Sequence, residues 1–276
     1  MLKHTSFIEL SARERAQAIL DKGTFRELLG PFEGIRSPWL EPQGIVTQAD
    51  DGMVIARGKL AGLDCVVAAV EGGFQGGSMG EVSGAKMASA LELAAESCRA
   101  GHPMVAVLCL ETGGVRLQEA NLGLAAIADI HAAIADLRRY APVIGVVAGT
   151  VGCFGGMSIA AGLCSYLVVT REARLGLNGP QVIEQEAGVA EYDSRNKPFI
   201  WQMTGGAVRA KVGLADALCE DDAPKIREAV CGFAKEGVPA KFRSEKVDVY
   251  LPKVESYDTS VQADSKQILR FFGKEE

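Results

Sequence analysis

The chain has 276 residues, 48% of them hydrophobic, which is enough for one large domain with a sizeable core. Its formal net charge of −6, from 35 acidic and 29 basic residues, provides no global field for a polyanion and argues against nucleic acid as a partner. Seven cysteines form no C-x-x-C pair, so neither a zinc ribbon nor a disulfide framework is expected, and no metal site is predicted. The N-terminus lacks the apolar core of a signal peptide, which predicts a cytoplasmic protein.

The first elements of the chain are predicted from a capping signal and from apolar runs. Ser11 and Glu14 match a capping box, so we expect a short helix over residues 11–22. Residues 30–52 contain three prolines and several glycines and predict an irregular segment. Three apolar runs then predict strands, the last two almost unbroken as in a sheet covered on both faces: residues 53–60, 64–70 and 104–110.

Helices are expected between and after these strands. Ser83 can cap a helix over residues 84–100, and a second helix is expected over residues 115–140. Five residues are expected to share one face of the second helix: Leu117, Leu124, Ile127, His131 and Ile134. On this apolar face, His131 is expected to pack in the core or to lie at an interface. The strand-strand-helix order then repeats and predicts an α/β spiral of stacked units rather than a doubly wound sheet, with units at residues 53–100, 104–140 and 143–165.

Residues 140–170 contain no charged side chain and are long enough to cross a membrane. Pro142 and six glycines break this stretch, so we interpret it as the buried centre of a soluble domain with a strand at residues 166–170. No membrane association is predicted. Pro180 suits the first position of a helix, and three further helices are expected at residues 207–214, 225–235 and 260–272.

Two strand-to-helix turns run through glycine pairs, Gly113-Gly114 and Gly155-Gly156. The start of a helix leaves backbone N–H groups unpaired, and the aligned peptide dipoles add about half a positive charge there, which favours an anion. Either glycine pair alone can merely tighten a connection between a strand and a helix. Together, the two turns can supply both donors of one oxyanion hole.

Side chains offer little for a hydrolytic or metal-dependent mechanism. The segment Gly-Met-Ser-Ile-Ala at 156–160 misses the G-x-S-x-G pattern, and no histidine stands at metal-ligand spacing. Glu111 and Glu119 flank the first glycine turn and are candidate acids or bases, although Glu119 is expected to be solvated on the helix surface. Arg116 is expected to form a surface ion pair or to bind a ligand carboxylate. A third glycine cluster, with Lys86 as a counter-charge, predicts a loop that approaches a pantetheine-like arm or a phosphate.

Taken together and in order, these motifs resemble the carboxyltransferase branch of the crotonase-like proteins. The motifs are Gly-Gly-Ser-Met-Gly at 76–80, Gly-Gly-Val-Arg-Leu-Gln-Glu-Ala at 113–120, and Gly-Gly-Met-Ser at 155–158 followed by Leu-Asn-Gly-Pro-Gln-Val-Ile-Glu-Gln at 177–185. They are similar to those of acetyl-CoA carboxylase carboxyltransferase β subunits. This chain has no cysteine before Cys65, however, and so lacks the four-cysteine zinc ribbon with which the bacterial subunits usually begin. With Ala-Glu-Tyr-Asp-Ser-Arg at 190–195, the chain most resembles malonate decarboxylase β subunits.

The resemblance implies an α/β fold of the ClpP/crotonase type, a spiral of repeated β-β-α units. It implies an N-terminal helix and lead-in at 1–50, a carboxyltransferase domain at 51–220 and a C-terminal helical extension at 221–276 that contacts a partner subunit. The implied activity is biotin-independent decarboxylation of a malonyl thioester to the acetyl thioester and CO₂, together with a homologous γ subunit. The substrate is carried on an acyl carrier protein by a CoA-like phosphopantetheine prosthetic group, and this chain binds no cofactor itself.

The resemblance also implies where the site residues lie. The oxyanion hole falls on the backbone N–H groups of Gly114 or Val115 and of Gly155 or Gly156. Substrate contacts are implied for ten residues around the glycine motifs: Gly76, Gly77, Ser78, Met79, Gly80, Gly113, Arg116, Asn178, Gly179 and Pro180. Tyr192 and Glu111 are candidates for the proton donor. Two alternatives stay open, namely a carboxyltransferase that uses biotin and a non-catalytic scaffold that binds acyl-CoA.

Overall fold

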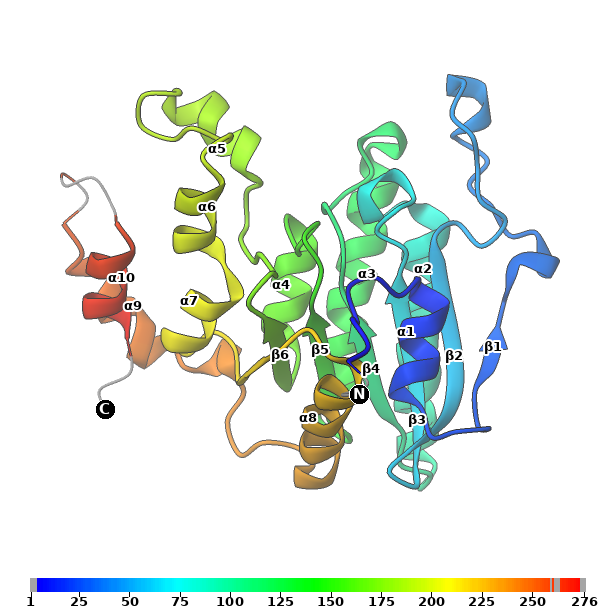
Figure 1. The fold of residues 1–276 in the computed structure, drawn as a ribbon. Coiled ribbons are helices and arrows are strands. Elements are labelled where there is room, and N and C mark those ends of the chain that lie inside the picture. The colour runs from blue at the N-terminus through cyan, green and yellow to red at the C-terminus, as the bar shows by residue number, and fades with distance from the viewer. Residues whose placement is uncertain (1–3, 259, 261–263, 274–276) are drawn as a thin grey trace.

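The computed structural model describes residues 4–258, 260 and 264–273, and its centre is a seven-stranded sheet (Figure 1). The strands lie in the sheet in the same order as in the chain. The pairs β1/β2 and β2/β3 are antiparallel, and every later pair is parallel. The bounds are β1 (Arg26–Leu28), β2 (Met53–Leu60), β3 (Leu63–Val70), β4 (Val105–Cys109), β5 (Val143–Val147), β6 (Tyr166–Thr170) and β7 (Ala217–Cys219).

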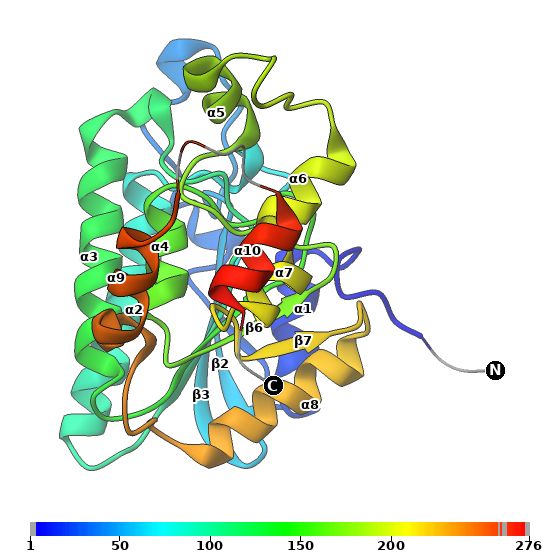
Figure 2. The ribbon, with the colours of Figure 1, turned by 90° about the vertical axis from the view of Figure 1, so that its left-hand side faces the viewer.

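Helices cover both faces of this sheet, which explains why the central strands are apolar along their whole length. On one face lie α2 (Glu81–Arg99), α3 (Asn121–Leu137) and α4 (Gly156–Leu163). On the other face lie α1 (Ala12–Ile19) and α8 (Ala223–Glu236), as Figure 2 shows. The N-terminal helix and α8 therefore pack on the same sheet as the residues expected to form the carboxyltransferase domain.

The segments that follow the parallel strands form a second, much shorter ladder. It consists of isolated parallel bridges: Met79 with Val115, Thr112 with Cys153, and Cys153 with Leu175. Each unit is thus a long strand, a bridging residue and a helix. This arrangement confirms the predicted spiral of β-β-α units, with the second strand of each unit reduced to a bridge.

Three predicted helices begin or end at different residues in the structure. The capping box at Ser11 is present, but α1 ends at Ile19. The N-cap of α2 is Gly80 and not Ser83. Ser83 lies in the first turn of the helix, where its hydroxyl accepts the N–H of Gly80 at 2.9 Å. The helix α3 begins at Asn121 rather than at residue 115, since the preceding residues form a turn and the 3₁₀ helix η4 (Leu117–Glu119).

The later start of α3 also changes which of its residues face the core. Ile127 and Ile134 are buried as predicted, but Leu117 and Leu124 are 80% and 54% exposed. His131 is half-buried, and its Nε2 lies 2.7 Å from the carbonyl oxygen of Gly156 in α4. The predicted face of α3 was therefore wrong at its N-terminal end.

The C-terminal part of the chain is helical. Pro180 is the first residue of its helix, as predicted, whereas α6, α9 and the edge strands β1 and β7 were not predicted. The last predicted helix begins at Ser265, and residues 261–263 lie outside the described residues. No helix in the described ranges is long and apolar enough to span a membrane. The helices are α5 (Pro180–Ala187), α6 (Lys197–Thr204), α7 (Gly206–Lys211), α9 (Val247–Glu255) and α10 (Ser265–Phe272).

Candidate active site

Glycine clusters that are far apart in the sequence lie side by side beyond the ends of the parallel strands. Met79 donates its N–H to the oxygen of Gly114 at 2.7 Å and accepts the N–H of Arg116 at 2.8 Å. The N–H of Gly155 in turn donates to the oxygen of Leu177 at 2.7 Å. These bonds join the four segments that carry the family motifs into two pairs, and the Phe154 N–H, which donates to the oxygen of Thr112 at 3.0 Å, links the two pairs.

The two glycine turns face each other at van der Waals distance. A Cβ atom on Gly114 would lie 3.3 Å from the Cα of Gly155, and a Cβ on Gly155 would lie 3.3 Å from the Cα of Gly114. Their φ angles are +106° and +60°, in the region that favours glycine. At Gly77 a Cβ would lie only 2.0 Å from the carbonyl oxygen of Glu111, so the loop of the third cluster also needs a glycine to approach the first turn.

The hydrogen bonds distinguish the four predicted amide donors. The N–H of Gly114 donates to Thr112 Oγ1 at 3.1 Å, and that of Gly155 is bound to Leu177. The N–H groups of Val115 and Gly156 have no acceptor among the described residues. Gly156 is the first residue of α4, where the helix dipole adds positive potential. A Cβ built on Gly155 would lie 3.9 Å from the nitrogen of Val115, so the two free donors belong to adjacent turns.

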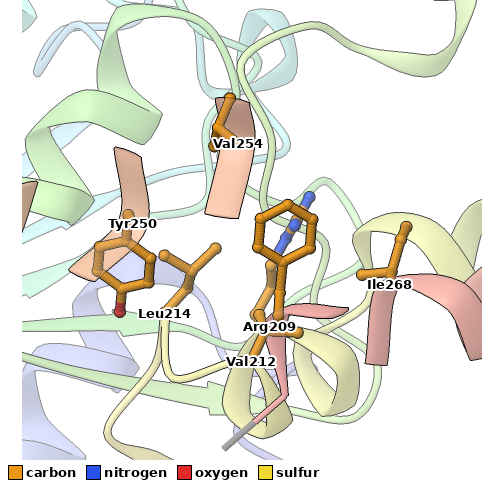
Figure 3. A pocket seen from close by; sticks show the side chains of 7 residues that line it. Arg209, Val212, Leu214, Tyr250, Val254 and Ile268 are labelled. Atoms are coloured by element: carbon orange, nitrogen blue, oxygen red, sulfur yellow. The ribbon is translucent and has the colours of Figure 1, made fainter. Parts of the chain in front are cut away.

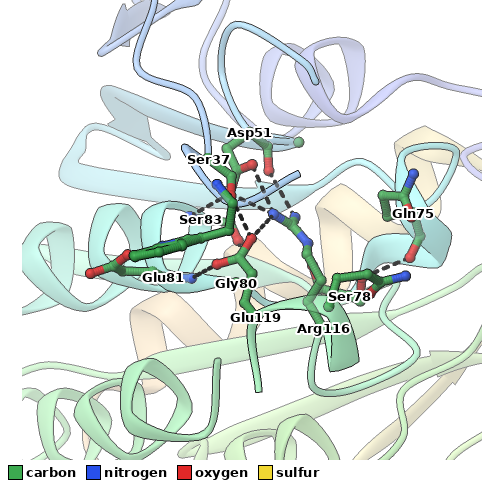
Figure 4. A network of polar contacts seen from close by, with 12 residues as sticks. Ser37, Asp51, Gln75, Ser78, Gly80, Glu81, Ser83, Arg116 and Glu119 are labelled. Atoms are coloured by element: carbon green, nitrogen blue, oxygen red, sulfur yellow. Dashed lines mark hydrogen bonds and ion pairs between the residues drawn. The ribbon is translucent and has the colours of Figure 1, made fainter. Parts of the chain in front are cut away.

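Arg116 is buried in the centre of a polar network instead of forming the expected surface pair (Figure 4). Its Nη1 donates to Asp51 Oδ1 at 2.8 Å and to Glu119 Oε1 at 2.9 Å, and its Nη2 donates to the oxygen of Ser78 at 3.0 Å. Glu119 is 4% exposed, so its expected place on a helix surface was wrong as well. Both side chains turn inward because this segment is a turn and not the first part of α3.

The same network occupies the N-terminus of α2. Glu119 Oε2 accepts the N–H of Glu81 at 2.7 Å, and Asp51 Oδ2 accepts the N–H of Ser83 at 2.9 Å. The positive end of this helix is thereby satisfied by carboxylates of the chain itself. Sequence reasoning missed Asp51. The Asp-Asp-Gly run at 50–52 marks a turn, but only the tertiary contact shows which aspartate is used.

Lys86 does not serve as a counter-charge for a ligand, contrary to expectation. Its ammonium group is buried and donates to the carbonyl oxygens of Asp50 at 2.8 Å and Met53 at 2.5 Å. Burial lowers the pKa of this side chain. Lys86 holds the turn before β2 and faces away from solvent.

The two candidate proton donors occupy different surroundings. Glu111 is buried after β4, where its Oε1 accepts the N–H of Val151 at 3.2 Å and its Oε2 pairs with Arg15 of α1. Gly149 leaves room for this carboxylate, since a Cβ there would lie 1.7 Å from Oε1. The Tyr192 hydroxyl is buried without a hydrogen-bond partner in the described part of the chain, and burial raises its pKa. Both roles stay predictions.

The remaining predicted substrate contacts differ in accessibility. Gly76, Gly113 and Asn178 are exposed, whereas Gly80 and Pro180 are buried. The other three positions are Ser78 and Gly179, which are half-buried, and Met79, which is buried. In the described ranges no group of three or more His, Cys, Asp or Glu side chains could hold a metal ion.

Comparison with known proteins places this geometry in a family. Residues 8–271 match the family model of the carboxyl transferase domain. Over 237 residues the chain is 41% identical to malonyl-S-ACP:biotin-protein carboxyltransferase MADC of Malonomonas rubra, covering 82% of this chain and 74% of that protein.

Solved structures agree with the family match. A chain of the Pseudomonas malonate decarboxylase hetero-tetramer in complex with malonate superposes with a TM-score of 0.96 at 64% identity, covering 98% of both chains. A chain of the Pseudomonas malonate decarboxylase MdcD-MdcE hetero-dimer gives a TM-score of 0.78 at 58% identity, covering 91% of this chain and 97% of that one. The chain therefore belongs to the carboxyl transferase domain family, whose crotonase-like fold it has, and within that family it groups with the subunits of malonate decarboxylase.

Proposed function

We propose that this chain is the β subunit of a malonate decarboxylase and converts a malonyl thioester on an acyl carrier protein into the acetyl thioester and CO₂. The observation that carries the proposal is the pair of unbonded N–H groups of Val115 and Gly156 in two adjacent turns. The 64% identity to a malonate decarboxylase chain over almost its whole length supports it. A homologous γ subunit is the expected partner, since the related structures are a hetero-tetramer and a hetero-dimer.

The proposed chemistry needs no side-chain nucleophile. When the carboxylate leaves as CO₂, the electron pair of the broken C–C bond moves into the thioester and forms an enolate. Its negative charge lies on the thioester oxygen, where Val115 and Gly156 would donate hydrogen bonds. Donors that are fixed in place stabilise this charge more than the neutral carbonyl, and each contributes about 3 kcal/mol. The carbon then accepts a proton, for which Tyr192 and Glu111 stay the candidates, and the acetyl thioester results.

The proposed substrate contacts surround these donors. The exposed backbone at Gly76 and Gly113 lies beside the first turn, since the Gly113 N–H donates to the oxygen of Gly76 at 2.9 Å. Asn178 and Gly179 follow the residue that accepts the Gly155 N–H. We place the pantetheine-like arm of the carrier protein along these segments. The arm belongs to the carrier protein, and this chain supplies no cofactor of its own.

The experiment is CO₂ release from malonyl-carrier protein by the assembled complex of this chain and its partner subunit. Adding avidin in excess removes any biotin-dependent route. Release that continues unchanged with avidin supports the proposal. Release that stops with avidin and returns with a biotinylated protein would replace it with the second candidate.

That second candidate is transfer of the carboxyl group from the malonyl thioester to a biotin protein. It is favoured by the 41% identity to the malonyl-S-ACP:biotin-protein carboxyltransferase. Both reactions pass through the same enolate, so the same two amides would serve either. A non-catalytic scaffold, by contrast, would not depend on the Gly156 N–H.

A further inference from the structure

Arg209 of α7 carries a charge that the described residues do not balance. Its Nε donates to the carbonyl oxygen of Leu175 at 2.8 Å, but its two Nη atoms have no acceptor in the described ranges. None of the described carboxylates forms an ion pair with it, and burial lowers the pKa of its guanidinium. The Tyr192 hydroxyl, itself buried and unbonded, interacts with it electrostatically. A half-buried cation that no described carboxylate balances is costly, which indicates a site for an anion.

Arg209 lines two cavities. The first has a volume of about 250 Å³ and is lined by Ser158 and Gly162 of α4 and by Gly176 and Leu177. The second, of about 340 Å³, lies under the C-terminal helices, where Figure 3 shows Arg209 among apolar side chains. For comparison, an apolar cavity of about 150 Å³ holds a benzene molecule. The first cavity can therefore hold a short acyl group.

The wall of the first cavity is bonded to the turn that carries the free amide of Gly156. Ser158 Oγ donates to the oxygen of Gly155 at 2.7 Å, and Leu177 accepts the Gly155 N–H. Two residues of the cavity wall are thus bonded to Gly155, the residue directly before the Gly156 N–H. Arg243 also lines the cavity, but its guanidinium is already paired with Asp216.

We propose that Arg209 binds the free carboxylate of the malonyl group inside the 250 Å³ cavity and thereby selects a dicarboxylic half-thioester over a simple acyl thioester. This inference rests on the proposed function. The planar guanidinium offers both Nη atoms to one carboxylate. Because the contact is made before CO₂ leaves, it stabilises the bound substrate and acts mainly on KM, with a smaller effect on kcat.

The test measures binding without turnover, by calorimetry on the assembled complex with monomethyl malonate and dimethyl malonate. The monoester has one free carboxylate beside an ester carbonyl, as in the substrate, and the diester has none. The wild-type complex should bind the monoester at least about tenfold more tightly, and Arg209→Met should weaken that binding by roughly 10- to 100-fold. Arg209→Lys, which keeps a charge, should recover part of the lost affinity.

The control is Lys211→Met, which removes an exposed cation of the same helix and should leave the affinity for the monoester unchanged.

Equal affinity for the two esters, or unchanged monoester binding by Arg209→Met, would overturn the inference. So would inorganic phosphate if it displaced the monoester with equal or better affinity, because the site would then be a phosphate clamp. If Arg209→Met does not assemble, Arg209→Lys takes its place as the test variant, and equal affinity of the wild-type complex for the two esters still overturns the inference. Monoester binding that depends on Arg209 in a complex that releases no CO₂ would refute the proposed function and leave the subsite standing.

Discussion

The N–H of Gly156 can be removed by substitution with proline, because this residue is the first of α4. Proline is well accommodated at that position, since its missing N–H has no helical partner there. Gly155 before it has φ +60° and ψ −146°, the mirror image of the extended conformation that precedes proline, and a glycine can keep it. A Cβ at position 156 would, however, lie 2.7 Å from Cγ2 of Ile127. We therefore combine the change with Ile127→Ala, which removes that atom.

We compare two double variants that both contain Ile127→Ala. One also carries Gly156→Pro, and its matched control carries Gly156→Ala. Both carry the same truncation of Ile127, which costs about 2–5 kcal/mol of stability, and both place a Cβ in the space it leaves. They differ chiefly in the backbone N–H. Loss of one oxyanion-hole donor costs about 3–4 kcal/mol of transition-state stabilisation, so kcat for the proline variant should be about 10²–10³ lower than for the alanine variant.

The assay is CO₂ release under saturating malonyl-carrier protein, after gel filtration has shown that both variants assemble with the partner subunit. Their unfolding midpoints in urea should be similar, since the truncation of Ile127 is shared and proline suits the first position of a helix. Equal kcat values for two assembled variants would refute the role of this amide. They would instead favour the scaffold interpretation.

Three further results are expected. Arg116→Met leaves its two carboxylate partners uncompensated in a buried network and should lower the free energy of unfolding by about 3–5 kcal/mol in urea; an unchanged midpoint would contradict the network's role. Arg15→Met should cost a similar amount by isolating the Glu111 carboxylate, and adding Glu111→Gln should restore part of it, whereas additive losses would show that the pair is uncoupled. Burial raises the pKa of Cys109 and Cys164 to about 12, so a thiol reagent at pH 8 should label them only after denaturation, as mass spectrometry would show.

Much of the fold could be predicted because its strongest signals are local. The strand Met53–Leu60 and the strand Tyr166–Thr170 were predicted with the bounds they have, since both are apolar runs between clear breakers. The helix start at Pro180 was likewise set by a single residue. By contrast, the three-residue strands β1 and β7 depend on pairing with longer neighbours and carry no signal of their own.

The candidate site likewise has parts that local sequence signals predict and parts that depend on tertiary contacts. The glycine pairs could be found in the sequence, but which of Gly114 and Val115 keeps an unbonded N–H could not, because the Gly114 N–H is taken up by the Thr112 hydroxyl. Arg116 was identified as important, while its burial with Asp51 comes from a contact between residues 65 positions apart. Periodicity also extended the predicted helix backwards over residues 115–120, where the structure has a turn in which Val115 pairs with Met79.

The proposed oxyanion hole, because it would consist of main-chain donors, should tolerate many nearby substitutions. No single side chain supplies the two free amides, so most substitutions nearby would alter substrate preference or assembly and leave the donors in place. The exceptions are positions such as Gly77 and Gly114, where a Cβ would meet the facing backbone at 2.0 Å and 3.1 Å. In related sequences, a larger residue at either position would therefore be expected to distort the proposed oxyanion hole.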